Sequence, residues 1–278
     1  MTEFGVVTRN EEELAWPEFD RGFYEAKDVT GRQAEPAAAG VNMVSCFGDN
    51  AAAAADPDLV PVDDEGNRAT RERPYFDWAY VCPSRERYRD GLLEIVEDCV
   101  AVNDDLRLDD VGFPRGEYCH CDVCERAFAD SDHEDWRAWR ASVITEFVAE
   151  AVDRVPGRTY LTLYPDPYPG RLYERAGLDV EALAAHVDEF VVPLYDTAYG
   201  TTYWLETIAA GFADLLSTPF SVELYCVNVE VENLLHAAEV AEAYGESVLF
   251  GYQAANARGA LRRRRADRSD AGETYTPE

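Results

Sequence analysis

The segment Leu106–Cys124 reads LRLDDVGFPRGEYCHCDVC and indicates the fold of the chain. A short apolar run ends in two adjacent carboxylates, Asp109 and Asp110, and is followed by a turn and three closely spaced cysteines. In α/β barrels, polar residues at the C-terminal ends of short hydrophobic strands form the functional site. The segment therefore predicts a barrel strand with site residues at its end, followed by a loop with soft metal ligands.

Similar apolar runs recur along the chain, with helical periodicity between them. This alternation is typical of a mostly parallel sheet, and a TIM-type (β/α)8 barrel accounts for the order. Seven runs are evident, which leaves three alternatives: the first strand is missing, it is irregular, or the barrel is open. The runs are 5–9, 41–47, 106–111, 159–164, 189–195, 220–225 and 247–252.

The organisation of the chain is expected to be simple. No shift in composition divides it, so residues 1–260 are expected to form a single barrel domain. Residues 49–77 have weak periodicity and are expected to form a long loop at one mouth of the barrel. Residues 261–278 are polar, and this C-terminal tail is expected to be disordered.

The chain is strongly acidic. Its 55 Asp and Glu against 25 Lys and Arg give a formal net charge of -30, and Lys27 is the only lysine. Phosphate binding needs clustered basic side chains, so we expect neither nucleic acid nor a membrane as a partner. Such a carboxylate shell is typical of a halophilic protein in a high-salt cytoplasm. The N-terminus MTEFGVVTRNEEEL lacks the basic and apolar regions of a signal peptide, which also favours a cytoplasmic location.

Carboxylates and tyrosines gather at the ends of the predicted strands. Paired acids cleave glycosidic bonds and aromatic faces stack on pyranose rings, so the pattern predicts a carbohydrate substrate. Strand alternation points neighbouring side chains to opposite sides, so only one of Asp109 and Asp110 is expected to face the barrel mouth directly. The other candidate catalytic residues are Asp196 and Glu223. Candidate substrate-binding residues are Asp166, Tyr164, Tyr195, Tyr225, Tyr252 and Gln253.

The cysteines suggest a metal site. Seven cysteines in a cytosolic protein are better explained as thiols or metal ligands than as a disulfide framework. Cys119, Cys121 and Cys124 offer three soft ligands, and a structural zinc needs a fourth. Cys82 is the first candidate for that ligand, with His120 and His133 as alternatives, and buried free cysteines are the competing interpretation. Such a zinc would fix the loop after the fourth strand without taking part in catalysis.

One part of the chain resembles a known family. Residues 82–128, CPSRERYRDGLLEIVEDCVAVNDDLRLDDVGFPRGEYCHCDVCERAF, resemble the glycoside hydrolase-like (β/α)8 barrels of haloarchaeal type. The shared features are a Cys-Pro before a Tyr-Arg helix, a strand that ends in Leu-Asp, an aromatic-proline turn and a Cys-x-Cys-x-x-Cys cluster. The upstream PDLVPVDDEGN is similar to a loop of that family, so the resemblance covers residues 57–128.

The resemblance implies a barrel related to α-amylase-like and α-galactosidase-like enzymes, with residues 106–111 as strand four and a strand-four aspartate as nucleophile. We therefore expect a glycoside hydrolase in which Asp109 or Asp110 is the nucleophile and Asp196 or Glu223 is the general acid and base. No cofactor is expected for catalysis. The alternative is a barrel that binds carbohydrate, or scaffolds a partner, without hydrolysis.

Overall fold

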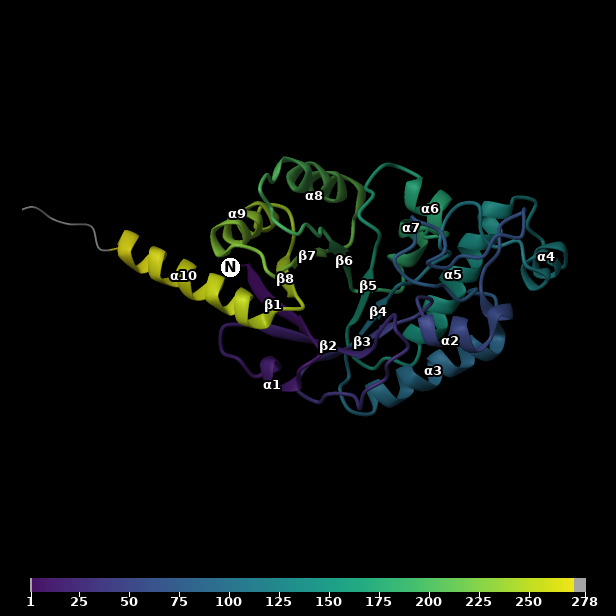
Figure 1. Ribbon diagram of the computed structural model, residues 1–278, viewed down its shortest axis with the longest axis horizontal. Helices are drawn as coiled ribbons and strands as arrows, with labels where there is room; N and C mark the ends of the chain where they lie inside the picture. The colour runs from purple at the N-terminus through teal and green to yellow at the C-terminus, as the bar shows by residue number, and fades with distance from the viewer. Residues whose placement is uncertain (1, 273–278) are drawn as a thin grey trace, which may run out of the picture.

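The computed structural model describes residues 2–272. Within this range, eight parallel strands close into a barrel in sequential order, with β8 paired to β1 (Figure 1). The predicted TIM-type (β/α)8 fold is confirmed, and the barrel is closed. The strands are β1 (Glu3–Thr8), β2 (Arg21–Lys27), β3 (Val41–Ser45), β4 (Leu106–Asp109), β5 (Thr159–Thr162), β6 (Glu189–Pro193), β7 (Phe220–Tyr225) and β8 (Ser247–Gly251).

The strand absent from the sequence analysis is β2, so the expectation of a missing or irregular first strand was wrong. β1 pairs in regular parallel register with both β2 and β8. β2 reads RGFYEAK, and its charged residues interrupt the apolar run by which a strand is recognised. They are accommodated in the barrel because they have ion-pair partners: Arg21 pairs with Glu189 and Glu25 pairs with Arg9.

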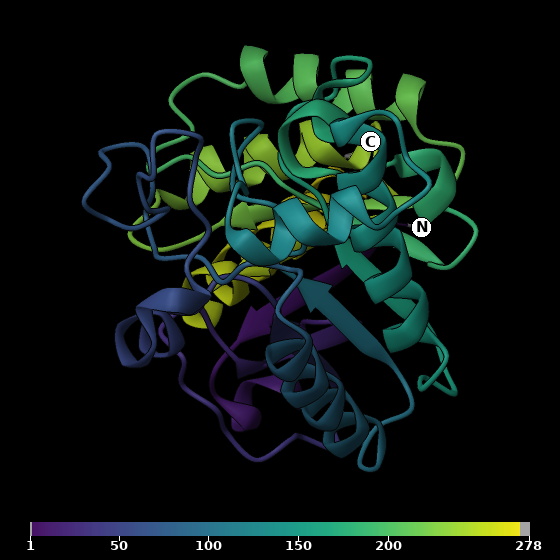
Figure 2. The same ribbon diagram turned by 90° about the vertical axis from the view of Figure 1, so that its right-hand side faces the viewer.

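Helices surround the barrel and follow most of the strands (Figure 1). Figure 2 views the molecule from the end at which α4 lies. Among the described residues, no helix combines the length and apolar character needed to cross a membrane. The helices are α1 (Glu11–Leu14), α2 (Asn50–Ala55), the 3-10 turn η1 (Pro57–Leu59), α3 (Glu86–Val100), α4 (Asp122–Ala129), α5 (Trp136–Val152), α6 (Arg171–Ala176), α7 (Val180–Leu183), α8 (Tyr203–Leu215), α9 (Val231–Glu242) and α10 (Ala254–Gly272).

Two segments differ in detail from the expected loop and tail. The segment 49–77 contains α2 and η1. Each is preceded by an N-cap aspartate, Asp49 or Asp56, whose side chain accepts a hydrogen bond from a backbone N–H group of the first turn. Helix α10 continues to Gly272, so residues 261–272 are helical where a disordered tail was expected. The rest of that expected tail, 273–278, lies outside the described residues. In Figure 1, α10 extends away from the barrel on the side opposite α4.

Two of the buried hydrophobic clusters build the barrel core. A small cluster that includes Phe23, Met43 and Leu249 fills the barrel, and a larger one packs the outer faces of the strands against the helices. The C-terminal half of the barrel interior is polar, because Arg107 and Glu223 are fully buried there. The apolar core thus positions a charged layer at the C-terminal ends of the strands, where barrel enzymes place their chemistry.

Candidate active site and metal centre

A cavity of about 410 Å³ opens at the C-terminal ends of the strands, and we call it the central cavity. Its volume lies within the roughly 300–1,000 Å³ of ordinary small-molecule sites. Its walls combine aromatic rings with three carboxylates and two arginines, the composition expected of a site for a polyhydroxylated ligand. The lining residues used below are Glu25, Asp109, Asp110, Arg9, Arg107, Trp78, Trp204, Tyr164, Tyr195 and Tyr252.

Both aspartates at the end of β4 line the central cavity, so the expectation that only one faces the mouth was wrong. Asp109 follows the strand alternation and lies on the same side as Arg107, whose Nη2 is 3.7 Å from Asp109 Oδ2. Asp110 has a φ of 50°, in the left-handed region. This backbone conformation ends the alternation and brings the second carboxyl group to the same cavity.

The surroundings of Asp110 favour its protonated form. Ser45 Oγ is 2.6 Å from Asp110 Oδ2 and 3.0 Å from the carbonyl oxygen of Gly48. A hydroxyl has only one hydrogen to donate. Ser45 Oγ therefore donates to Asp110 Oδ2 or to the carbonyl oxygen of Gly48, but not to both at once. Burial and the neighbouring charge of Asp109 raise the pKa of Asp110 to about 8, against the opposing effects of Ser45 and Lys27.

The raised pKa of Asp110 makes the stability of the fold depend on pH. The folded protein holds this proton up to about pH 8, whereas an unfolded chain releases it near the ordinary value of about 3.9. The stability that the proton contributes is full below pH 4 and is lost as the pH rises through 8, with a slope of at most about 1.4 kcal/mol per unit. We therefore expect Asp110→Asn to flatten the fall in stability between pH 5 and pH 8.

The measurement is the free energy of unfolding in urea at pH 5, 6.5 and 8, for the wild type and Asp110→Asn. Asparagine suits the site, because it is uncharged and its amide oxygen can accept the bond from Ser45 Oγ. Asp196→Asn is the matched control and should leave the wild-type slope unchanged. Parallel curves for the wild type and Asp110→Asn would show that Asp110 is ionised across this range.

Glu25 is a cavity carboxylate that sequence reasoning missed. It lies on β2, the strand that was not recognised, and lines the central cavity together with its ion-pair partner Arg9. Burial raises the pKa of Glu25, while the bond from Arg9 opposes the shift. In the sequence, Glu25 is a single carboxylate that follows the aromatic residues of GFYEA. It can be recognised as a candidate site residue only after this segment has been assigned as a strand.

A buried ionic network lies beneath the cavity. Arg107 Nη2 is 2.6 Å from Glu223 Oε2, and the hydroxyl of Tyr195 donates to Glu223 Oε1 at 2.5 Å. Arg107 Nε also donates to Thr162 Oγ1 at 3.0 Å. Glu223 is fully buried and is not among the described residues that line the central cavity. Its geometry suits a residue that orients Arg107 and Tyr195.

The remaining predicted site residues are divided between the central cavity and its surroundings. Tyr164, Tyr195 and Tyr252 line it. Four residues do not, within the part of the chain that the structure describes. Asp196 accepts a bond from the N–H of Ala198, Asp166 lies 3.8 Å from Arg171, and Gln253 accepts a bond from the N–H of Asn228. The fourth is Tyr225, whose ring centroid is 5.6 Å from that of Tyr195.

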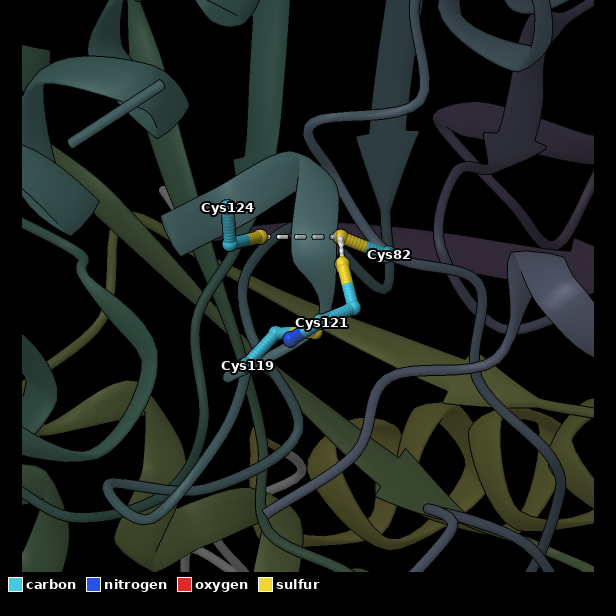
Figure 3. Close-up of side chains that lie close together, drawn as sticks. All are labelled: Cys82, Cys119, Cys121 and Cys124. Atoms are coloured by element: carbon cyan, nitrogen blue, oxygen red, sulfur yellow. Dashed lines mark hydrogen bonds between the residues drawn. The ribbon is translucent and has the colours of Figure 1, made fainter. Parts of the chain in front are cut away.

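Four cysteines form a compact buried cluster that could hold a metal ion. The sulfur atoms of Cys82, Cys119, Cys121 and Cys124 all lie within 4.8 Å of one another. Figure 3 shows Cys82 pointing toward Cys121 and Cys124, at sulfur separations of 3.9 and 3.3 Å. The choice of Cys82 as the fourth member is confirmed. His120, the first alternative, instead lies 2.7 Å from Glu125 and stacks on Trp136. His133, the second, is exposed.

The cysteine cluster joins two loops at the mouth of the barrel. Cys82 follows β3 and lies four residues after Trp78, which lines the central cavity, whereas the other three cysteines follow β4 and its two aspartates. Cys124 belongs to the first turn of α4, and Cys121 precedes that helix. A metal bound here would therefore fix one wall of the cavity relative to the end of β4.

Comparisons with known proteins identify the fold. No protein-family model and no curated protein sequence matches the chain. Among solved structures, α-L-fucosidase isoenzyme 2 from Paenibacillus thiaminolyticus is similar with a TM-score of 0.67 and 13% identity. That match covers 97% of this chain and 50% of the fucosidase, so the chain spans about half the length of that protein. An α-amylase from Lactobacillus plantarum has a TM-score of 0.46 and 11% identity over 90% of this chain and 70% of its own. The similarity to the fucosidase shows a barrel of the same fold, and at this identity the likeness extends to the fold alone.

Proposed function

We propose that the protein is a glycoside hydrolase that uses the two carboxyl groups at the end of β4. The observation that carries the proposal is that both carboxyl groups line the central cavity in different surroundings: burial raises the pKa of Asp110, while Asp109 lies 3.7 Å from the buried guanidinium of Arg107. Glycoside hydrolysis needs one protonated and one ionised carboxyl group beside the scissile bond. The aromatic walls of the central cavity supply the faces on which a sugar ring stacks.

In the proposed reaction, Asp110 donates its proton to the glycosidic oxygen as the carboxylate of Asp109 attacks the anomeric carbon. The bond to the leaving group breaks and a glycosyl ester forms on Asp109. Asp110 then takes a proton from water, and the water oxygen displaces Asp109 from the sugar. Adjacent residues hold their carboxyl groups close together, which favours the shorter separation of retaining enzymes.

The neighbouring residues assist this chemistry without exchanging protons. Glu25 is held by Arg9 and so serves as a hydrogen-bond acceptor for a sugar hydroxyl. Glu223 acts through Arg107, which it holds beside Asp109. This assignment replaces Asp196 and Glu223 as general acid and base with Asp110, because neither of them lines the central cavity within the described residues.

The test of Asp110 as acid is the dependence of activity on the leaving group. A good leaving group departs without protonation, so it does not need the acid. We expect Asp110→Asn to lower kcat/KM about a hundredfold or more for an alkyl glycoside, but less than about tenfold for the dinitrophenyl glycoside of the same sugar. The measurement compares both substrates, in both anomers and in molar salt.

Two results would contradict this assignment. Equal losses of kcat/KM on the two substrates would mean that Asp110 has another role. A comparable loss of kcat/KM in Asp196→Asn would instead make Asp196 the general acid. Folded wild-type protein that binds sugars and turns over none of them would favour the non-hydrolytic binding barrel.

We also propose that the cysteine cluster holds one structural zinc ion. Four thiolate ligands select soft metals and suit a closed tetrahedral site. Ligands 2.3 Å from a tetrahedral zinc are about 3.8 Å apart, and the observed separations of 3.9 and 3.3 Å from Cys82 bracket that value. The ion would hold the two loops together, and all four cysteines are buried.

A further inference from the structure

The central cavity has a charged floor and an apolar rim. Residues inside the strands build the floor, among them Glu25 on β2 and Arg107 and Asp109 on β4. Residues that follow the C-terminal ends of the strands build the rim. Arg9 is a charged residue of the rim and is paired with Glu25. Most of the rim is apolar, and its apolar residues include Trp78, Val111, Leu163, Leu194, Trp204 and Ile208.

The two carboxyl groups at the end of β4 lie on either side of the boundary between floor and rim. Asp109 is the last residue of β4 and lies 3.7 Å from Arg107 on the floor. Asp110 is the first residue beyond the strand. Besides burial, the charge of Asp110 raises the pKa of the rim residue Tyr164, and it does so more strongly than the charge of Asp109. A leaving group beside Asp110 therefore lies at the rim.

The rim suits a hydrocarbon group better than a second sugar. Leucine, isoleucine and valine side chains form no hydrogen bonds, and the hydroxyl of the rim residue Tyr195 already donates to Glu223. A sugar ring in the leaving group carries several hydroxyl groups, each of which loses water at such a wall without gaining a partner. An alkyl or aryl group instead gains free energy there in proportion to the apolar surface that it covers.

The apolar rim continues into a second hollow, which we call the α8 groove. It has a volume of about 340 Å³ and lies between α8 and the segment that joins β5 to α6. Ile208 lines both the central cavity and the α8 groove, so the two spaces meet at this side chain. The apolar side chains of the groove include Pro167, Tyr168, Pro169 and Leu215. An apolar chain that leaves the central cavity beside Asp110 can thus continue over Ile208 along a hydrocarbon surface.

We propose that the substrate is a glycoside of an apolar alcohol. Its sugar lies on the charged floor, and its alkyl or aryl group lies against Leu163, Leu194 and Ile208 and extends into the α8 groove. The proposal deepens the proposed function and rests on it, because Asp110 must protonate the oxygen that joins the sugar to the apolar group. It distinguishes this protein from an enzyme that shortens oligosaccharides, in which the leaving group is another sugar.

The experiment compares two glycosides that differ only in the length of an alkyl leaving group. Dinitrophenyl glycosides of gluco, galacto and 6-deoxygalacto configuration, in both anomers, first identify the sugar. The methyl and hexyl glycosides of that sugar release alcohols of similar acidity, and the hexyl chain adds only methylene groups. We expect the wild-type kcat/KM to be at least about thirtyfold higher for the hexyl than for the methyl glycoside, as burial of the added methylene groups implies.

Ile208→Asn places an amide where the alkyl chain passes from the central cavity to the α8 groove. It is expected to lower the ratio of the hexyl to the methyl kcat/KM at least about fivefold. Leu235→Asn is the matched control, because Leu235 is also a partly buried aliphatic residue, on the neighbouring helix α9, and lines neither space. It should keep the wild-type ratio, and circular dichroism checks that both variants are folded.

Equal kcat/KM values for the methyl and hexyl glycosides in the wild type would overturn the apolar leaving group and leave the proposed hydrolase intact. A folded Ile208→Asn variant with the wild-type ratio would overturn the placement of the alkyl chain on α8. Wild-type protein that hydrolyses no glycoside in the panel would instead overturn the proposed function, and this inference with it.

Discussion

Replacing Asp109 by asparagine is expected to lower kcat/KM about a thousandfold or more for every hydrolysed glycoside. The amide is nearly the same size as the carboxylate but cannot form the glycosyl ester or balance the positive charge at the anomeric carbon. The loss should be similar for good and poor leaving groups, because the nucleophile acts on the sugar in both cases. That pattern distinguishes Asp109 from Asp110, whose loss depends on the leaving group.

The measurement is kcat/KM of Asp109→Asn against dinitrophenyl and alkyl glycosides, with circular dichroism to show that the variant is folded. Asp196→Asn is the control, since Asp196 lies outside the central cavity and bonds to its own loop. Within a factor of a few it should retain wild-type activity. A folded Asp109→Asn variant with more than a tenth of the wild-type activity would exclude Asp109 as nucleophile.

Replacing Cys124 by serine is expected to release the metal and to destabilise the protein by several kcal/mol. Zinc bound to the folded chain and not to the unfolded chain contributes its binding energy to folding. Loss of about 3–5 kcal/mol corresponds to a fall in Tm of roughly 5–9 °C for a chain of this size. The wild type should contain one zinc per chain by elemental analysis, and a strong chelator should lower its Tm by a similar amount.

Cys226→Ser is the matched control, because Cys226 is also fully buried but lies at the end of β7, outside the cluster. It should keep the zinc and lose only the stability expected for a polar atom in an apolar site. Purified wild-type protein without bound metal, whose Tm does not change with added zinc or with chelator, would show that the four thiols are a packed apolar cluster.

The sequence allowed the barrel and the four-cysteine cluster to be predicted because both follow from patterns that are evident in the chain. Alternation of short strands with periodic helices predicts parallel pairing, and this held for seven strands. Cys82 was chosen because its segment, YVCPS, leads toward the same face of the barrel as the other three cysteines, and the pairing of β3 with β4 accounts for this proximity. Neither inference required knowledge of how a particular side chain is paired.

The site residues that could not be predicted from the sequence depend on partners that lie far apart along the chain. Glu25 looks like a surface residue until Arg9 and the closed barrel explain its burial. Strand alternation predicts that the Asp110 side chain points away from that of Asp109, but its positive φ brings it to the central cavity. Glu223 looks like a catalytic acid at a strand end until Arg107, on a strand across the barrel, accounts for its charge. Because seven strands of the eightfold barrel were evident, the eighth had to lie in a longer gap, and the gap before residue 41 contains the charged strand β2.

The buried ionic network has a consequence for work at high salt. At 1 M salt, exposed charges that lie more than about 3 Å apart are screened from one another. The repulsion among the surface carboxylates, which give the chain its net charge of -30, is therefore strongly reduced. Arg107 and Glu223 are shielded from solvent, and ions do not enter between them. Salt in the solvent therefore does not screen the attraction between Arg107 and Glu223. The contact between Arg107 and Glu223 should change little between dilute buffer and brine, even where the stability of the whole fold varies greatly.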